Sequence, residues 1–230
     1  MTALGFGEQI LRWADQLAGH SDQADGLTVA YLTLAHQTAA AEIAGWMIEA
    51  GLQVDIDALG NVVGRYPAAD PTAKTLLTGS HFDTVRDGGK YDGRLGILLP
   101  IAVVRWLNEH RIRLPYHLEI VAFAEEEGLR FASSFLASSA LAGQFDFRWL
   151  DATDDDGVAL RDALRAAGLP GTEASIRALA RDPQHLAGFV EVHIEQGPVL
   201  EERGLPLGIV TSIAGGVRCS ARVLGTASHA

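Results

Sequence analysis

Residues 75–109 read TLLTGSHFDTVRDGGKYDGRLGILLPIAVVRWLNE, and residues 117–128 read HLEIVAFAEEEG. The first stretch opens with a β-favouring segment at residues 75–80 and continues, after a glycine-rich loop, into an apolar helix at residues 93–109. A second apolar strand is expected at residues 117–124. Strands that alternate with helices in this way predict an α/β fold, in which helices cover the faces of a sheet.

Further elements are expected on both sides of this stretch. Ala- and Leu-rich segments with apolar residues near helical spacing predict helices at residues 5–18 and 30–50. Short β-favouring segments predict strands at residues 52–56 and 61–66. Later in the chain we expect helices at 133–141, 158–167 and 172–180, a strand at 189–194, and strand-like segments from 207 to 224.

The composition is that of a globular protein, since 48% of the 230 residues are hydrophobic and 20% are charged. Eighteen basic against 29 acidic residues give a net charge of −11, and no segment gathers the Lys and Arg that a nucleic acid requires. Cys219 is the single cysteine, so no internal disulfide can form, and the N-terminal residues lack the charge pattern of a signal peptide. The longest apolar run, residues 97–104, is far shorter than the roughly 20 residues of a membrane span. We therefore expect a cytoplasmic protein with no nucleic-acid or membrane partner.

A histidine and two aspartates follow the strand at residues 75–80. His81 and Asp83 come directly after it, and Asp92 lies at the end of the glycine-rich loop. Ligand sites in open α/β sheets lie beyond the carboxyl ends of the strands, so His81 and Asp92 are placed where a divalent metal could bind. Asp83 could orient the His81 imidazole. A capped loop with a hydrogen-bonded histidine explains these residues equally well.

Three consecutive glutamates, Glu125, Glu126 and Glu127, follow the strand at residues 117–124. Neighbouring strand residues point to opposite faces, so Glu126 and Glu127 can share a cavity only if the backbone leaves the extended conformation, which Gly128 permits. By itself, such an acidic run is more often a solvated loop than a cation site.

His193 lies in a third polar segment, the residues 189–197 that read FVEVHIEQG, where strand alternation would place Glu191, His193 and Glu195 on one face. Taken alone, such a histidine is more often structural than a metal ligand. The concurrence of three strand ends that each carry His or carboxylate favours a metal site, because divalent metals take such ligands. A structural zinc site is disfavoured, since the chain lacks a cysteine pair.

Five motifs together carry a resemblance to a known family. They are GSHFDTV (79–85), GGKYDG (88–93), AEEEG-x-RF (124–131), VEVHIEQGPVLE (190–201) and G-x-x-SHA (225–230). In this combination and order, the chain resembles the M20-type metallohydrolases of the hydantoinase/carbamoylase group, which includes allantoate amidohydrolases and N-carbamoyl-L-amino-acid hydrolases.

The resemblance implies a three-layer, zinc-peptidase-like catalytic domain over residues 1–212, with a mixed sheet flanked by helices. Residues 213–230 would be the start of an inserted α+β dimerisation (lid) domain. Because members of the family continue further, we expect the chain to be a fragment that lacks part of both domains.

The resemblance also implies two divalent metal ions per subunit, for which zinc, manganese, cobalt and nickel are comparably suitable. His81, Asp92 and His193 would bind the first ion. Asp92 would bridge to the second ion, to which Glu127 also binds, and Glu126 would remain off the metals as the general base.

Four other residues take roles by this resemblance, and for Asp83 it agrees with the role inferred above. Asp83 would orient His81, and Gln196 would lie in the wall of the active site. His229 would reach the active site of the partner subunit in a homodimer and stabilise the oxyanion. Arg218 would bind a carboxylate of the substrate.

The leading hypothesis is metal-dependent hydrolysis of a ureido or carbamoyl C–N bond in a small molecule, with allantoate converted to ureidoglycine, ammonia and carbon dioxide. Hydrolysis of an N-carbamoyl-L-amino acid, or a β-ureidopropionase-like reaction, is the alternative within the same group. Two other hypotheses remain open. One is a dipeptidase or N-acyl-amino-acid deacylase of the wider M20 group, and the other is a truncated, non-catalytic remnant that binds a metal or a partner.

Overall fold

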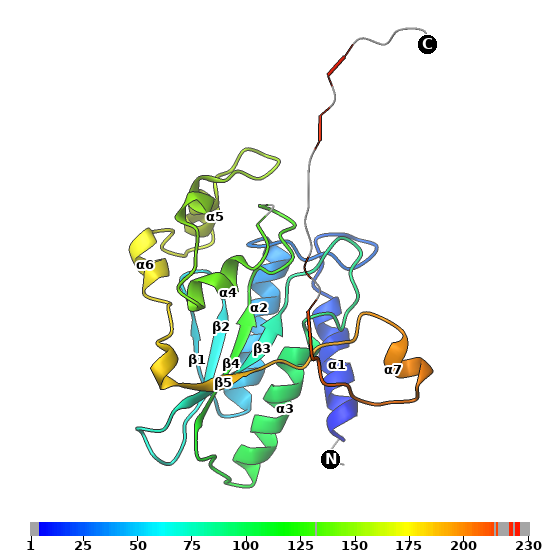
Figure 1. Ribbon diagram of the computed structural model, residues 1–230, viewed down its shortest axis with the longest axis vertical. Helices are drawn as coiled ribbons and strands as arrows, with labels where there is room; N and C mark the ends of the chain where they lie inside the picture. Colours follow the sequence, from blue (N-terminus) through cyan, green and yellow to red (C-terminus); the bar gives the residue numbers. More distant parts are fainter. Residues whose placement is uncertain (1–4, 132, 214, 216–220, 223, 226–230) are drawn as a thin grey trace. The chain divides into compact units, whose positions relative to one another are not determined.

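The computed structural model describes residues 5–131, 133–213, 215, 221, 222, 224 and 225. The chain divides into two units, Met1–Ile194 and Glu195–Ala230. The first unit contains a mixed sheet with helices on its faces, as the sequence predicts (Figure 1).

The sheet of the first unit has the strand order β1-β2-β4-β3-β5. Strand β3 is parallel to both β4 and β5, whereas β2 is antiparallel to β1 and β4. The carboxyl ends of β3 and β4 therefore meet at one edge of the sheet. The strands are β1 (Gln53–Ile56), β2 (Val62–Tyr66), β3 (Thr75–His81), β4 (His117–Phe123) and β5 (Leu186–Val190).

Strands β3 and β4 are the most deeply buried of the sheet, and each has a neighbouring strand on both sides. Gly79 allows their close approach. It has a φ of 145°, and a Cβ at this position would lie 1.9 Å from the carbonyl oxygen of Val121 in β4. A larger residue at position 79 would therefore push the two strands apart.

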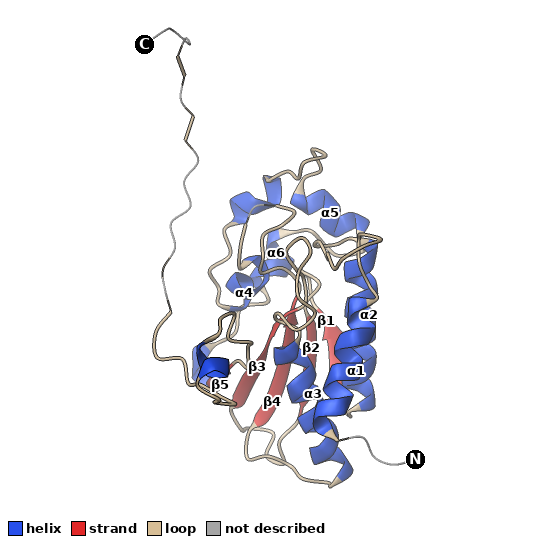
Figure 2. Cartoon of the chain, turned by 90° about the vertical axis from the view of Figure 1, so that its right-hand side faces the viewer, coloured by secondary structure: helices blue, strands red, loops and turns tan. Residues whose placement is uncertain are grey.

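Helices α1 (Phe6–Ala18), α2 (Leu34–Glu49) and α3 (Leu95–Glu109) lie together on one face of the sheet (Figure 2). α2 packs against β1 and β2, α3 packs against β3 and β4, and α1 packs against α3. The side chains that fill this core are apolar and buried; they include Leu17, Ile43, Met47, Ile97, Ile101 and Ile120.

The opposite face is covered in part by α4 (Leu136–Leu141), where Leu141 packs with Leu77 of β3 and Val121 of β4. α5 (Leu160–Ala166) and α6 (Glu173–Arg177) add further apolar side chains to the main core. Two short 3₁₀ helices, Phe147–Asp151 and Pro183–His185, connect these elements.

Two sequence-based boundaries were wrong by four residues. The helix expected from residue 30 begins at Leu34, because the side chain of Thr33 accepts a hydrogen bond from the His36 amide and so caps the helix there. The strand expected at 189–194 is displaced to Leu186–Val190, since its pairing with β3 ends at the Thr78–Val190 pair.

In the second unit, the expected strand-like segment is absent from the described residues 207–213, which form no regular structure. A short helix that the sequence pattern did not indicate, α7 (Val199–Glu202), precedes them. The rest of the strand-like region expected at 207–224 falls largely outside the described residues.

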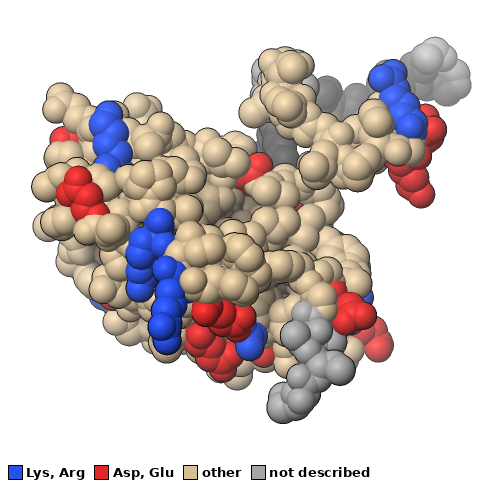
Figure 3. Space-filling model, turned by 90° about the horizontal axis from the view of Figure 1, so that it is seen from below, with Lys and Arg blue, Asp and Glu red and all other residues tan. Residues whose placement is uncertain are grey.

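The surface mixes charges of both signs. On the face seen in Figure 3, Lys and Arg side chains lie next to Asp and Glu, and most of the surface is neither. Among the described residues, no helix combines the length and the apolar character that a membrane crossing requires.

Candidate metal centre

His81 is the last residue of β3 and is buried beside the turn that leads to α3. Its Nδ1 donates a hydrogen bond to the carbonyl oxygen of Asp83 at 3.0 Å. Its Nε2 lies 3.8 Å from Oδ1 of Asp92. The backbone thus holds one ring nitrogen, and the other faces a carboxylate.

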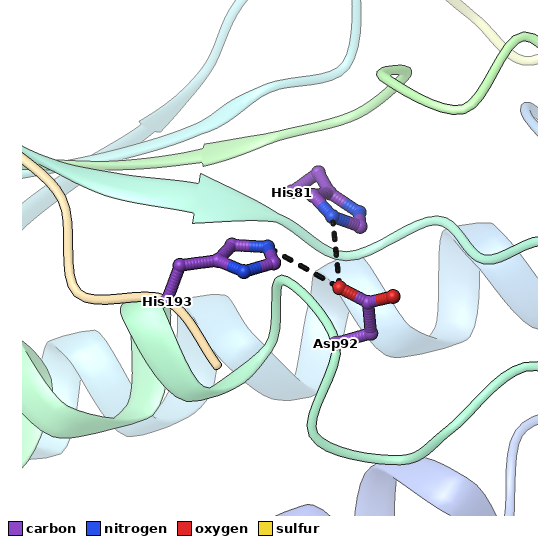
Figure 4. A group of neighbouring side chains, drawn as sticks. All are labelled: His81, Asp92 and His193. Atoms are coloured by element: carbon purple, nitrogen blue, oxygen red, sulfur yellow. Dashed lines mark ion pairs between the residues drawn. The ribbon is translucent and has the colours of Figure 1, made fainter. Parts of the chain in front are cut away.

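His193 approaches the same carboxylate from the segment that follows β5. Its Nε2 lies 3.2 Å from Oδ1 of Asp92, and its Nδ1 donates to the carbonyl oxygen of Ile194 at 2.9 Å. Figure 4 shows both imidazoles directed at one oxygen of Asp92. The structure therefore brings together the residues that the sequence proposed for the first metal ion.

Two glycines at the start of α3 allow His81 and His193 to lie close to Asp92. A Cβ on Gly93, which has a φ of 65°, would lie 2.4 Å from the carbonyl oxygen of His81. A Cβ on Gly96 would lie 2.4 Å from the carbonyl oxygen of Val192 and would displace the segment that carries His193.

A side-chain hydrogen bond anchors the segment between β5 and His193. The Ser80 hydroxyl donates to Oε1 of Glu191 at 2.5 Å, just beyond the last backbone pair between β3 and β5. His193 is therefore held by this bond and by its close packing on α3. The strand alternation that the sequence suggested for this segment was wrong, because β5 ends at Val190.

The donor set fits a divalent metal ion. One ligand atom from each of His81, Asp92 and His193 lies within 4.8 Å of the other two. Imidazole and carboxylate ligands suit the borderline and hard divalent metals, and imidazoles that bind a metal commonly donate their second N–H to a backbone carbonyl, as both histidines do here.

The proton on His81 competes with such an ion. Burial lowers the pKa of His81, but the hydrogen bond and the negative charge of Asp83 outweigh it and raise the pKa from 6.5 to about 9. Without a metal the imidazole is thus protonated near neutral pH, and binding of an ion requires loss of that proton.

Glu126 and Glu127 also lie close to His81. One atom from each of these three residues also falls within 4.8 Å of the others, which gives a second group with metal-binding potential. The two groups share His81, whereas the resemblance makes Asp92 the shared residue. The bridging role of Asp92 thus remains a prediction.

Asp83 fixes the loop that carries these glutamates. Its carboxylate accepts the backbone N–H of Glu126 at 3.1 Å and that of Glu127 at 3.0 Å, and its Oδ1 lies 3.4 Å from Nδ1 of His81. β4 ends at Phe123, so the backbone has left the extended conformation before the glutamates, as their placement in one cavity required. Asp83 therefore connects the β3 end to the β4 end.

The three glutamates differ in environment. Partial burial raises the pKa of Glu126 and of Glu127, and the charge of His81 opposes that change in both. Glu125 is completely buried, and burial raises its pKa well above the usual range. The Gly128 amide favours the charged form of Glu125, but in the part of the chain that the structure describes neither carboxylate oxygen has a partner with hydrogen-bond geometry.

The remaining predicted site residues lie outside this unit. Gln196 is in the second unit, where it has a φ of 58°. Arg218 and His229 lie outside the described residues.

The sequence analysis missed two contributors in this region. One is the hydrogen bond between Ser80 and Glu191, which no local pattern signals. The other is Arg94, which is completely buried at the start of α3. A charged residue directly before the apolar first turns of α3 was the available signal for Arg94.

Two surface cavities lie away from the candidate metal centre. One, of about 510 Å³, is lined by residues that include Arg65, Glu119 and Arg181. The other, of about 530 Å³, is lined by residues that include Asp22, Arg86 and Asp154. Neither includes a predicted metal ligand, so the geometry of the side chains, not cavity size, identifies the site.

Comparison with known proteins agrees with the motifs. The family model for peptidase family M20/M25/M40 matches residues 77–226. The chain is 43% identical over 217 residues to an allantoate deiminase of Arabidopsis thaliana, which covers 94% of this chain and 41% of the relative. It is 42% identical over 205 residues to an N-carbamoyl-L-amino acid amidohydrolase of Geobacillus stearothermophilus, with 89% and 50% covered.

A solved structure shares the fold. The hydantoinase/carbamoylase family amidase from Burkholderia ambifaria superposes with a TM-score of 0.78 at 36% identity, over 86% of this chain and 47% of that one. The chain thus spans about half the length of the relatives it matches. From its motifs, its match to the family model and its fold, the chain belongs to peptidase family M20/M25/M40 and is similar there to the hydantoinase/carbamoylase amidases.

Proposed function

We propose that this chain supplies the metal-binding and base-bearing part of an enzyme that hydrolyses a ureido or carbamoyl C–N bond. The observation that carries the proposal is the convergence of His81 and His193 on one oxygen of Asp92, beside Glu126 and Glu127. The allantoate deiminase and N-carbamoyl-L-amino acid amidohydrolase relatives support the substrate class. Allantoate is the proposed substrate, and ureidoglycine, ammonia and carbon dioxide are the products.

His81, Asp92 and His193 are the proposed ligands of one divalent ion, and Glu127 with a bridging Asp92 the proposed ligands of a second. Zinc, manganese, cobalt and nickel all suit these ligands. Ions bound there would acidify a water molecule and polarise the carbonyl group of the substrate.

Glu126 is the proposed general base and acid. It would accept the proton of the attacking water and return it to the departing nitrogen as the C–N bond breaks. Cleavage of the terminal C–N bond releases ammonia and leaves a carbamate, which loses carbon dioxide to give the amine. The raised pKa of Glu126, which partial burial causes, suits a group that must both take and give a proton.

The rest of the proposal concerns residues and partners beyond the first unit. In a cytoplasmic homodimer, His229 would stabilise the oxyanion in the partner's active site, Arg218 would bind the substrate carboxylate, and Gln196 would line the site.

The test is release of ammonia from allantoate. The assay uses the chain and the longest form that its gene encodes, each loaded with a divalent metal. We expect Glu126→Gln to reduce turnover at least 100-fold, on the order of what a general base contributes, with metal content unchanged. Glu49→Gln, at an exposed position on α2, is the matched control and should leave turnover unchanged. Substantial activity of Glu126→Gln would contradict the assignment of the base.

A second candidate substrate is an N-carbamoyl-L-amino acid, which the Geobacillus relative favours. The same assay includes this substrate and a dipeptide. Faster ammonia release from the carbamoyl amino acid would reassign the substrate within the group, and dipeptide cleavage would indicate the wider M20 activity. If neither form hydrolyses any of these substrates with metal bound, the result would support the non-catalytic alternative.

A further inference from the structure

Arg94 has no solvent exposure, and among the described residues it is one of the largest fully buried side chains. It lies at the start of α3, two positions after Asp92. Burial of an ionised group is costly unless nearby groups compensate for the lost hydration. The contacts of Arg94 therefore decide what its charge does in the fold.

Arg94 hydrogen-bonds to two of the three segments that carry proposed ligands of the first ion. Its Nε donates to the carbonyl oxygen of Phe82 at 3.3 Å, and Phe82 lies between His81 and Asp83. Its backbone N–H donates to the carbonyl oxygen of Asp92 at 2.7 Å. One residue thus joins the end of β3 to the turn before α3.

Asp83 is the acidic group that stabilises the charge of Arg94, since the negative charge of its carboxylate favours the charged form of the guanidinium. That carboxylate also accepts the amides of Glu126 and Glu127. The side chain of Arg94 is therefore bonded to the end of β3 at Phe82, and its charge acts on the carboxylate that holds the glutamate loop.

Stability alone does not explain why a charged side chain is buried at position 94. Nη1 and Nη2 of Arg94 have no hydrogen-bond partner among the described residues, so the guanidinium is desolvated without full compensation. An apolar side chain of similar length would fill the same space without that cost, as replacements of buried ion pairs by apolar residues have often proved neutral or stabilising.

We propose that Arg94 is a positioning residue of the metal centre, whose guanidinium holds the 81–83 segment against the turn at Asp92 and so keeps His81 and Asp92 at the spacing that one ion needs. This inference rests on the proposed function, since it presupposes the first metal site. Arg94 acts through the backbone at Phe82 and through Asp83, and has no contact with the ion.

The test is titration of the full chain with Co²⁺, followed by the visible absorption of the bound ion, which reports its ligands. We expect Arg94→Met to fold and to bind Co²⁺ about 10- to 100-fold more weakly, with an altered spectrum, as is typical when a group that supports metal ligands is lost. Arg94→Lys keeps the charge but cannot reproduce the planar contact with Phe82, so we expect an intermediate Kd and a partly restored spectrum.

Two further variants serve as references. Arg86→Met, at an exposed position on the same connection, should bind Co²⁺ with the wild-type Kd and spectrum. His81→Ala should lose the first site. A purely structural role of Arg94 would move the thermal unfolding midpoint and leave the Kd and spectrum of the folded protein unchanged.

The outcomes separate this inference from the proposed function. Absence of Co²⁺ binding by the wild-type chain, or unchanged binding by His81→Ala, overturns the first metal site and the role of Arg94 with it. Loss of binding in His81→Ala together with wild-type binding in Arg94→Met overturns the role of Arg94 only. If Arg94→Met does not fold, Arg94→Lys decides: a weaker Kd with an altered spectrum supports the inference, and a wild-type Kd and spectrum overturn it.

Discussion

His36 lies in the core next to the strand ends that carry the candidate site. Its ring packs against that of Phe82, with the centroids 4.5 Å apart, and its Nε2 donates to the carbonyl oxygen of Ala124 at 2.8 Å. Burial lowers the pKa of His36 from 6.5 to about 4, although the Ala124 carbonyl opposes that change. His36 therefore stays neutral in the folded protein at pH values where it is protonated in the unfolded chain.

This difference predicts a pH dependence of stability. The contribution of neutral His36 is fully present above pH 6.5 and is lost as the pH falls from 6.5 towards 4, because the unfolded chain then binds a proton that the folded protein does not. Between pH 7 and pH 5 we expect the free energy of unfolding to fall by about 2 kcal/mol from this group. Urea denaturation at the two pH values measures the change.

The variant His36→Gln should remove this part of the pH dependence, whatever its own stability at pH 7. His185→Gln, at an exposed position, should leave it intact. Equal pH dependence in wild type and His36→Gln would show that another group is responsible.

At the scale of elements, the position of His193 depends on how closely α3 approaches the end of β5. Gly96 on α3 faces the carbonyl oxygen of Val192, and its hypothetical Cβ would also lie 2.7 Å from the Cβ of Ser80. Neither neighbour is the end of a flexible side chain, so added bulk at Gly96 must move the strand end or the segment after it.

We therefore expect Gly96→Ala to separate His193 from Asp92 and to weaken binding of the first metal ion at least tenfold. This is the loss of metal affinity that is typical when a group supporting a ligand is removed. Titration with Co²⁺ measures the change. Gly45→Ala is the matched control, since Gly45 lies in α2 with nothing within 4 Å of its hypothetical Cβ. That control should raise the free energy of unfolding by up to about 1 kcal/mol, because alanine favours a helix over glycine. Unchanged metal affinity in Gly96→Ala would show that His193 is positioned by other contacts.

At the scale of the whole molecule, β5 is an edge strand with apolar side chains in solvent. Phe189 is 49% exposed and Val190 is 54% exposed. A strand edge with unpaired backbone groups and exposed apolar residues favours pairing with another chain.

We expect the 230-residue chain to self-associate through β5, and we expect Val190→Lys to reduce the association, because a charged side chain on an edge strand opposes pairing. Sedimentation velocity over a range of concentrations measures the effect. Ile48→Lys is the control, since Ile48 is 62% exposed but lies on helix α2. An equal effect of both variants would indicate general hydrophobic association and not an edge-specific contact.

The sequence by itself determined the α/β class, the sheet-forming segments and the two strand ends that carry His81 and the glutamates. These features are local: the apolar periodicity that predicts a strand, and the identity of the residues directly after it, can be read from a short segment of sequence. The motifs also determined the family, which the comparisons confirmed.

Only the tertiary structure decided that His81, Asp92 and His193 converge on one point, that Asp83 holds the amides of Glu126 and Glu127, and that Arg94 lies buried behind them. The strand predicted at 189–194 was misplaced because contacts between distant segments determine its position. Where β5 ends is set by its pairing with β3 and by the packing of α3, and no local pattern encodes contacts between segments so far apart in the chain.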